Sequence, residues 1–262
     1  MRHTIATYQE HKVSVLPVIK GNGYGFGRGT LFKESAALGF DAVAVGTVFE
    51  AREALNDWDG TLVVLEPFLP SDSTAKQIWR DLTRGHAHRL VATVAGDYLN
   101  HAREVGVSRV RLEGATSMHR FGLKPHDIDH MLARIPDGIV IESLTIHLPI
   151  AEPDIKHVAA FETPGCASNT TGWMLETVGW LMNYASISTE RGLPLHVSSS
   201  HVSANDAGHV MEYAAMHPSL TLEIRIGTEL WLGAPHTLKA SGTVLEIPEA
   251  GMGHTRAGVP GA

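Results

Sequence analysis

The feature that most constrains the fold of this chain is a regular alternation of short β-branched runs with longer amphipathic segments. Alternation of this kind is typical of βα units wound around a parallel sheet. Eight runs have the length and composition of strands, and they lie at residues 13–19, 41–46, 61–66, 88–93, 108–114, 139–148, 194–200 and 220–227. Seven helical patterns separate them, at residues 30–40, 47–57, 74–85, 96–106, 124–135, 171–187 and 204–217.

Eight strands with seven intervening helices predict an α/β fold, a (β/α)8 TIM-type barrel of parallel strands. An open doubly wound sheet is the alternative arrangement of the same units. In a barrel, the active site is built where the strands end, at the C-terminal face of the sheet. Residues just after each predicted strand are therefore the first candidates for function.

The composition favours a small molecule as the partner. The formal net charge is −7 and no dense block of Lys and Arg occurs, so neither a nucleic acid nor an anionic membrane is expected to bind. The single cysteine, Cys166, fits a reducing compartment, and no run of about 18 apolar residues is present. We expect a soluble, cytoplasmic protein. The 16 histidines form no HExxH pattern, and no metal site is expected.

A lysine followed by five glycines marks the end of the first predicted strand, in the stretch VSVLPVIKGNGYGFGRGT. The glycines stand at every second position from 21 to 29, whereas a dinucleotide-binding GxGxxG needs spacings of two and then three. No GK[ST] follows, so a P-loop is excluded as well. What remains is Lys20 at a strand end. If it is partly buried, its pKa falls and its amine can form a Schiff base; an exposed strand-end lysine is the alternative.

The string VIKGNGYGFG resembles the cofactor-lysine motif of alanine racemases, V-K-A-N-A-Y-G-H-G, in the fold-type III enzymes that use pyridoxal 5'-phosphate (PLP). Four further stretches resemble motifs of that family in the same order. They are SMHRFG (117–122), LTIHLPIAEPD (144–154), HVSSS (196–200) and RIGTELWLG (225–233). The resemblance runs from Val15 to Gly233 and looks like that of a divergent branch of the family.

The resemblance implies a cofactor site. Lys20 would hold PLP and then act as a base at the substrate α-carbon, while the cofactor serves as electron sink. The other residues implied to bind the cofactor are Tyr24, Ser199 or Ser200, Gly227 and Thr228 at the phosphate, and Arg225 at the pyridine nitrogen. Phe26 stands where the family motif has a histidine.

Two further residues are implied to act with the lysine. Arg120 corresponds to an arginine that contacts the cofactor phenolic oxygen and the substrate side, and His147 to a histidine that lies against the cofactor ring. Glu113 stands where the family often has a modified lysine that orients this arginine, so we expect Glu113 to pair with Arg120. Two unrelated surface charges are the alternative for that pair.

The resemblance also implies that the C-terminal β domain of the family is incomplete in this chain. In the family, the second base is a tyrosine of a C-terminal β domain, supplied by the partner subunit of a homodimer. We expect a barrel domain over residues 1–235 and only a truncated start or remnant of the β domain over 236–262, and no tyrosine follows Tyr213. The N-terminus is also expected to be short, because the helix that usually precedes the first strand has too few residues here.

Two functions from different classes follow. The first is a PLP-dependent racemase (an isomerase of amino-acid metabolism), with alanine as the expected substrate and activity impaired if the chain is truncated. The alternative is a single-domain PLP-binding protein that buffers the cofactor, like the PLP homeostasis proteins that are also lone fold-type III barrels. A barrel that serves only in assembly is a third possibility.

Overall fold

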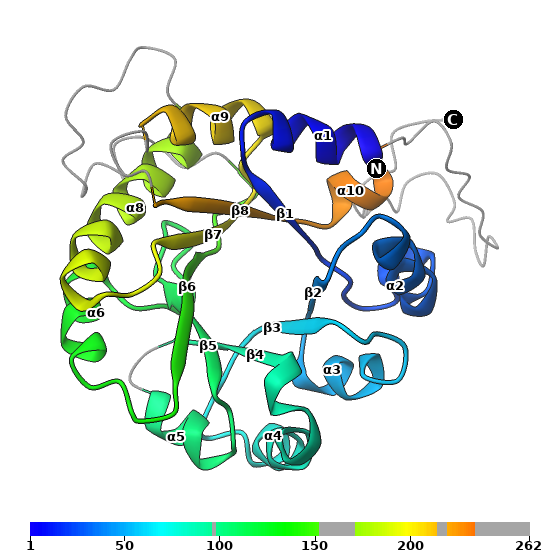
Figure 1. Cartoon of the computed structure of the whole chain (residues 1–262), viewed down its shortest axis with the longest axis vertical. Coiled ribbons are helices and arrows are strands. Elements are labelled where there is room, and N and C mark those ends of the chain that lie inside the picture. Colours follow the sequence, from blue (N-terminus) through cyan, green and yellow to red (C-terminus); the bar gives the residue numbers. More distant parts are fainter. Residues whose placement is uncertain (96–97, 152–170, 214–218, 234–262) are drawn as a thin grey trace, which may run out of the picture.

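The chain folds into a closed barrel. The computed structural model describes residues 1–95, 98–151, 171–213 and 219–233. Eight parallel strands are ordered β1-β8-β7-β6-β5-β4-β3-β2, and a parallel bridge between Val18 and Ala44 joins the two end strands (Figure 1). The amide of Ile19 donates to the Ala44 carbonyl at 2.7 Å. The predicted (β/α)8 barrel is confirmed, and the open doubly wound sheet is excluded.

The strands follow the predicted runs closely. Each differs from its run by at most two residues at either end, because turns such as the 3-10 helix η2 (Ala87–Arg89) take up the flanks. Their bounds are β1 (Ser14–Pro17), β2 (Ala42–Val45), β3 (Thr61–Pro67), β4 (Leu90–Val94), β5 (Arg109–Gly114), β6 (Val140–Ile146), β7 (His196–Ser200) and β8 (Thr221–Ile226).

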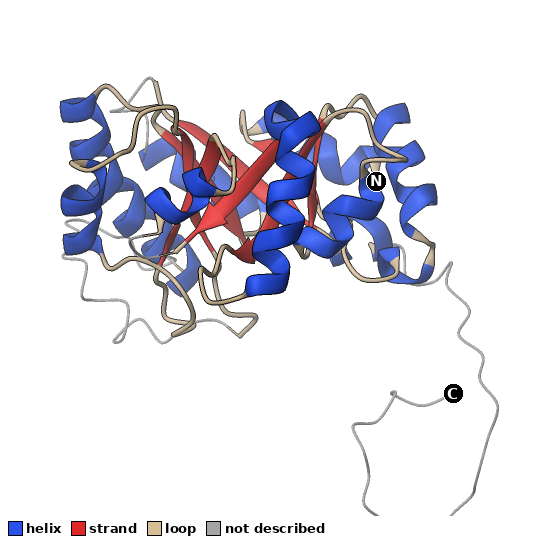
Figure 2. Cartoon of the chain, turned by 90° about the horizontal axis from the view of Figure 1, so that it is seen from below, coloured by secondary structure: helices blue, strands red, loops and turns tan. Residues whose placement is uncertain are grey.

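Helices surround the sheet, which lies at the centre of the molecule (Figure 2). Their bounds are α1 (Arg2–Glu10), η1 (Gly23–Gly25), α2 (Arg28–Ala37), α3 (Val48–Ala54), α4 (Ser73–His86), α5 (Leu99–Glu104), α6 (Pro125–Leu132), α8 (Gly172–Arg191), α9 (Ala204–Tyr213) and α10 (Thr228–Leu232). Helix α1 forms over nine residues, because Ile5 and Tyr8 give it a buried face against the barrel.

Local sequence signals set several helix ends. The side chains of Thr47, Asp72 and Thr171 accept hydrogen bonds from backbone amides in the first turns of α3, α4 and α8. Helix α8 ends at Gly192, whose φ of 63° places it in the left-handed region that a glycine adopts without strain. These caps fix where each helix begins or ends relative to the strand beside it.

The interior of the barrel is divided into an apolar and a polar half. Side chains from β1 to β4 form a small apolar cluster of Leu16, Val18, Ala44, Val63 and Val91. The inward positions of β5 to β8 instead carry polar side chains, and the buried ones are Arg111, Glu113, Ser143, Thr145, Ser198, Ser200, Glu223 and Arg225. Most barrels fill this space with branched apolar residues, so the polar half marks where chemistry is to be sought.

Some expectations concern residues outside the described part of the chain. These are Cys166, the last three residues of the 144–154 motif, and the domain expected over 236–262. Within the described residues, no helix is both long and apolar enough to cross a membrane.

Candidate functional site

A cavity of about 700 Å³ opens at the C-terminal ends of β1, β7 and β8. Its volume falls within the range of small-molecule and cofactor sites. The walls combine apolar residues with titratable ones, and they consist of Tyr8, Val18, Lys20, Tyr24, Leu65, His147, Ile150, Trp173, Ser200, His201, Val202, Ser203, Ile224, Arg225, Ile226, Gly227, Thr228 and Glu229. This is the end of the barrel where the sequence predicted the site.

Most of the predicted site residues meet at this cavity. Those that line it are Lys20, Tyr24, His147, Ser200, Arg225, Gly227 and Thr228. Ser199 and Arg120 are not among the lining residues. In the β7–β8 pairing, Ser200 is opposite Arg225 and Ser199 opposite Ile224. Since successive strand residues face opposite sides, Ser200 shares the inner face with Arg225, and Ser199 lies on the outer one.

Lys20 is exposed rather than partly buried, which corrects the sequence-based expectation. It follows Ile19, the last buried residue of the β1 segment, and the chain turns into the loop at Gly21 with a φ of 59°. The lysine nonetheless lines the cavity. Burial is the main cause that lowers the pKa values of His147 and His201 there, and the positive charges of Arg225 and Lys20 act in the same direction.

The repeated glycines after Lys20 have a conformational cause. Gly23 has a φ of 55°, and a Cβ at this position would lie 2.9 Å from the backbone nitrogen of Arg28. Tyr24 itself adopts a φ of 53°, which is uncommon for a residue with a side chain. This tight turn carries the Tyr24 ring to Gly227, where a Cβ would lie 1.8 Å from the Tyr24 hydroxyl oxygen. The stretches VIKGNGYGFG and RIGTELWLG, about 200 residues apart in the sequence, therefore meet in space.

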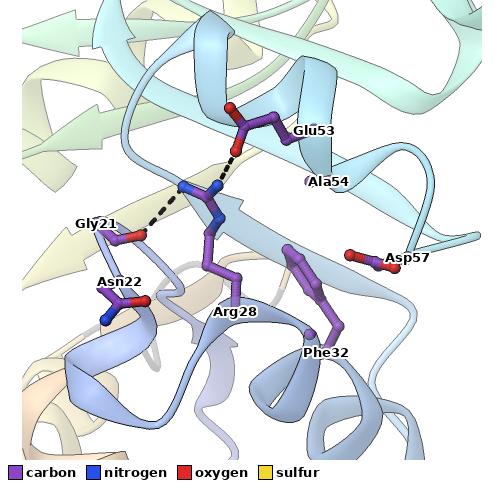
Figure 3. Close-up of a pocket in the computed structure, with 8 residues that line it drawn as sticks. Gly21, Asn22, Arg28, Phe32, Glu53, Ala54 and Asp57 are labelled. Atoms are coloured by element: carbon purple, nitrogen blue, oxygen red, sulfur yellow. Dashed lines mark hydrogen bonds and ion pairs between the residues drawn. The ribbon is translucent and has the colours of Figure 1, made fainter.

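Helix α3 anchors the lysine loop from the outside. The Glu50 carboxylate accepts from the amides of Gly21, at 3.0 Å, and Gly46, at 2.7 Å. Arg28 donates to the Gly21 carbonyl at 3.1 Å and pairs with Glu53 (Figure 3). A second cavity of about 470 Å³ adjoins these residues. The backbone amide and carbonyl of Gly21 are thus both hydrogen-bonded to side chains.

Arg225 is buried and held by neighbouring strands. It donates to the Ser198 carbonyl at 2.9 Å, to the Ser198 hydroxyl at 3.1 Å and to the Ile146 carbonyl at 2.7 Å. A further bond reaches the hydroxyl of Thr145. None of these bonds uses Nε. Burial lowers the pKa of Arg225, while the nearby Glu113 and Glu223 carboxylates act in the opposite direction.

His147 is a neutral group at this site. Burial lowers its pKa to about 3, and the positive charges of Arg225 and Lys20 act in the same direction. The ring of His201 packs against it edge-on at 5.2 Å between centroids. The His147 carbonyl accepts from the Thr116 hydroxyl at 2.6 Å. A neutral imidazole can both donate and accept a hydrogen bond, and it can pack against a flat ring.

Arg120 and Glu113 do not form a salt bridge in the described structure. Arg120 is exposed on the loop after β5, 5.8 Å from the centroid of the Phe121 ring. Glu113 is buried, and burial raises its pKa to about 7 although the charges of Arg225 and Arg120 lower it. Of these two positive charges, that of Arg225 lowers the pKa of Glu113 more. Glu176 on α8 fixes the loop, accepting from the Ser117 amide at 2.5 Å and hydroxyl at 2.6 Å.

Sequence reasoning missed a buried ionic network beneath the cavity. Arg111 pairs with Glu223 at 2.6 Å, and the Ser198 hydroxyl donates to the same carboxylate at 2.6 Å. Ser198 also accepts from Arg225, so the network reaches the cavity wall. One signal was available: Arg111 with Glu113, and Glu223 with Arg225, are charged residues two apart inside otherwise apolar strands. Such spacing places both charges of each strand on one face.

The fold and the cavity define a parallel (β/α)8 barrel domain with a lysine, an arginine and a neutral histidine at the C-terminal end of its strands. The sequence profile of the family described as alanine racemase, N-terminal domain, matches residues 1–235. The chain therefore belongs to this family. No curated protein sequence matched significantly. Among the described residues, no cluster of three or more His, Cys, Asp or Glu side chains could hold a metal ion.

Solved structures share the fold. The biosynthetic alanine racemase of Pseudomonas aeruginosa is 20% identical, with a TM-score of 0.57, and the match covers 88% of this chain and 56% of that one. The alanine racemase of D-cycloserine-producing Streptomyces lavendulae is 16% identical, with a TM-score of 0.58 and the same coverage. A D-threo-3-hydroxyaspartate dehydratase H351A mutant is 17% identical (TM-score 0.54, 86% and 55% covered). The chain spans a little over half the length of these proteins.

Proposed function

We propose that this chain binds PLP through Lys20 and acts as an amino-acid racemase, with alanine as the substrate. The observation that carries the proposal is the meeting of Lys20, Tyr24, His147, Ser200 and Arg225 at one cavity, although they come from four separate parts of the chain. Membership of the alanine racemase N-terminal domain family supports it. The dehydratase among the structural neighbours is the reason why the reaction remains a proposal.

The residues present fit this cofactor. The Tyr24 and Ser200 hydroxyls and the amides of Gly227 and Thr228 are neutral donors suited to a phosphate. The absence of a side chain at Gly227 lets the Tyr24 hydroxyl approach its backbone, since a Cβ there would lie 1.8 Å from the hydroxyl oxygen. His147 would pack against the pyridine ring. Ser200 rather than Ser199 is our choice for the phosphate, since it shares a face with Arg225.

The chain's own groups then handle protons. When bound, PLP supplies an electron sink for the charge that develops at the substrate α-carbon. Arg225 would donate a hydrogen bond to the pyridine nitrogen of the cofactor. It would not transfer its proton to that nitrogen, because a guanidinium stays charged. Lys20 would remove and return the α-proton, and Arg120, on the loop after β5, would contact the substrate side. A base on the opposite face would come from a partner subunit of a homodimer.

Reduction with borohydride tests the cofactor assignment. Protein incubated with PLP is expected to absorb in the visible range, and reduction should fix the pyridoxyl group on Lys20, as located by peptide mass spectrometry. The Lys20→Ala variant should take up no label, while Lys33→Ala, which removes an exposed lysine on α2, should label like the wild type. Wild-type protein that stays colourless would refute PLP binding.

Exchange of the α-proton tests the reaction. Alanine incubated with the PLP-loaded protein in heavy water should incorporate deuterium at the α-carbon, and D-alanine should form from L-alanine. Labelled Lys20 without any exchange would overturn the racemase proposal and favour the alternative, a PLP-binding protein that buffers the cofactor.

A further inference from the structure

A carboxylate lies beside the residues proposed to hold the cofactor phosphate. Glu229 directly follows Thr228 in the first turn of α10, and both line the cavity with Gly227. A carboxylate free to turn toward a phosphate dianion would weaken its binding, because like charges a few ångströms apart repel one another. The position of the Glu229 side chain therefore matters for any anion in this part of the cavity.

The hydroxyl of Tyr8 on α1 lies within hydrogen-bond distance of that side chain. This hydroxyl lies 3.2 Å from Oε2 of Glu229 and 2.9 Å from the Val202 carbonyl oxygen, and the tyrosine is only 1% exposed. Burial raises the pKa of Tyr8 far above its ordinary value, and the charges of Glu229 and Asp206 raise it further. Tyr8 thus keeps its proton, so the hydroxyl can always donate to one of these two acceptors.

We propose that Tyr8 is a positioning residue that holds the Glu229 carboxylate against α1, and that this makes the cavity selective for the phosphorylated form of the cofactor aldehyde. The inference rests on the proposed function, since it concerns the same cavity. It joins helix α1 to helix α10 through a hydrogen bond that spans 221 positions of sequence. Without the tyrosine hydroxyl, Glu229 is free to turn into the cavity.

Binding of two aldehydes by four proteins tests the proposal. Dissociation constants for PLP and for pyridoxal, which lacks the phosphate, are measured by absorbance titration with the wild type, Tyr8→Phe, Glu229→Gln and the double variant. Tyr8→Phe should weaken PLP binding about five- to tenfold and pyridoxal binding less than about twofold. Adding Glu229→Gln should restore PLP affinity to that of the single Glu229→Gln variant. Tyr98→Phe, outside the cavity, is the matched control.

Each result decides the matter. Equal weakening of PLP and pyridoxal in Tyr8→Phe would mean that the tyrosine serves only to pack the fold, and the proposal is then wrong. It is also wrong if Glu229→Gln fails to restore the double variant. Should Tyr8→Phe not fold, as judged by its melting temperature, Glu229→Gln alone decides. PLP affinity within about twofold of the wild type supports the proposal. A severalfold gain overturns it, because Glu229 would then already repel the phosphate in the wild type. Wild-type protein that binds neither aldehyde refutes the proposed function itself.

Discussion

The hydroxyl oxygen of Ser200 lies 3.2 Å from Nδ1 of His147, which links the ends of β7 and β6 at the cavity wall. The Leu148 amide donates to the same oxygen at 3.2 Å, so the serine oxygen is held between two strand ends. A neutral His147 can take part in this contact as acceptor or as donor, according to its tautomer. A neutral His147 is what the surrounding positive charges require.

The burial of neutral His147 should make the folded state sensitive to acid. Its pKa is about 3 in the folded chain and near 6.5 in the unfolded one, so between these values the unfolded state binds more protons. The stabilisation is complete above pH 6.5 and is lost as the pH falls toward 3. We expect His147→Gln to lose less stability than the wild type between pH 7 and pH 5, by on the order of 1 kcal/mol.

Urea unfolding at the two pH values measures this difference. His196 and His201 have pKa values lowered by burial as well, so some acid sensitivity should survive in His147→Gln. The exposed His3→Gln variant should behave as the wild type. An identical loss of stability in the wild type and in His147→Gln would contradict the assignment.

Glu113 should have the opposite pH dependence. Its pKa is about 7 in the folded chain, against 4.5 for an ordinary glutamate, so the folded state holds the extra proton between these values. Its contribution to stability is present below pH 4.5 and is lost as the pH rises through 7. Glu113→Gln imitates the protonated acid, and we expect it to gain about 1 kcal/mol over the wild type between pH 5 and pH 8.

Chemical denaturation at pH 5 and pH 8 tests the Glu113 prediction. Glu104→Gln, an exposed change on α5, should give the same difference from the wild type at both pH values. If the stability difference between Glu113→Gln and the wild type is the same at pH 5 and at pH 8, the pKa of Glu113 is not raised by folding and the prediction is wrong.

The barrel was predictable because its signal is repeated along the chain. Eight β-rich runs were each found to within two residues, and one glycine-lysine motif located the cavity end. Among the expected site residues, those that the structure brings to the cavity lie at strand ends, as with Lys20 and Arg225, or in the short turn that follows β1, as with Tyr24. The choice between Ser199 and Ser200 needed the β7–β8 register, which no spacing within the chain reveals.

Contacts between distant segments were not predictable. Nothing in the residues around Tyr8 indicates that its hydroxyl meets Glu229, because a tyrosine on a helix face is as consistent with simple core packing. The exposure of Lys20 likewise depends on where the loop turns, which is set by Glu50 of α3. Such tertiary contacts decide the electrostatics of the site while leaving little trace in local sequence.

The buried pair of Arg111 and Glu223 should respond very differently to single and double substitution. Although burial alone would raise the pKa of Glu223, Arg111 holds it at about 2. Glu223→Gln leaves two buried arginines without this carboxylate, and we expect a loss of about 3–5 kcal/mol in the free energy of unfolding. The double variant Arg111→Met and Glu223→Gln should recover most of that loss.

Urea unfolding at pH 7 measures the coupling between these two residues. Arg109→Met with Glu142→Gln serves as the control, since that pair is partly exposed and should couple by no more than about 1 kcal/mol. Additive effects of the Arg111 and Glu223 substitutions would show that the pair contributes no mutual stabilisation.

Glu50 should control the lysine loop, because one carboxylate joins the loops that follow β1 and β2. Each of its oxygens accepts from one backbone amide, of Gly21 and of Gly46. The two strands themselves meet at a single bridge, so this carboxylate is a main connection across the closing edge of the barrel.

Glu50→Gln keeps one acceptor and turns an N–H₂ group toward the other amide. Amide exchange at Gly21 should therefore accelerate about ten- to a hundredfold, as expected for the loss of a hydrogen bond to a charged group. Hydrogen exchange followed by NMR provides the measurement, with exposed Glu34→Gln on α2 as the control. Unchanged exchange at Gly21 in Glu50→Gln would mean that Arg28, which donates to the Gly21 carbonyl, is sufficient to hold the loop.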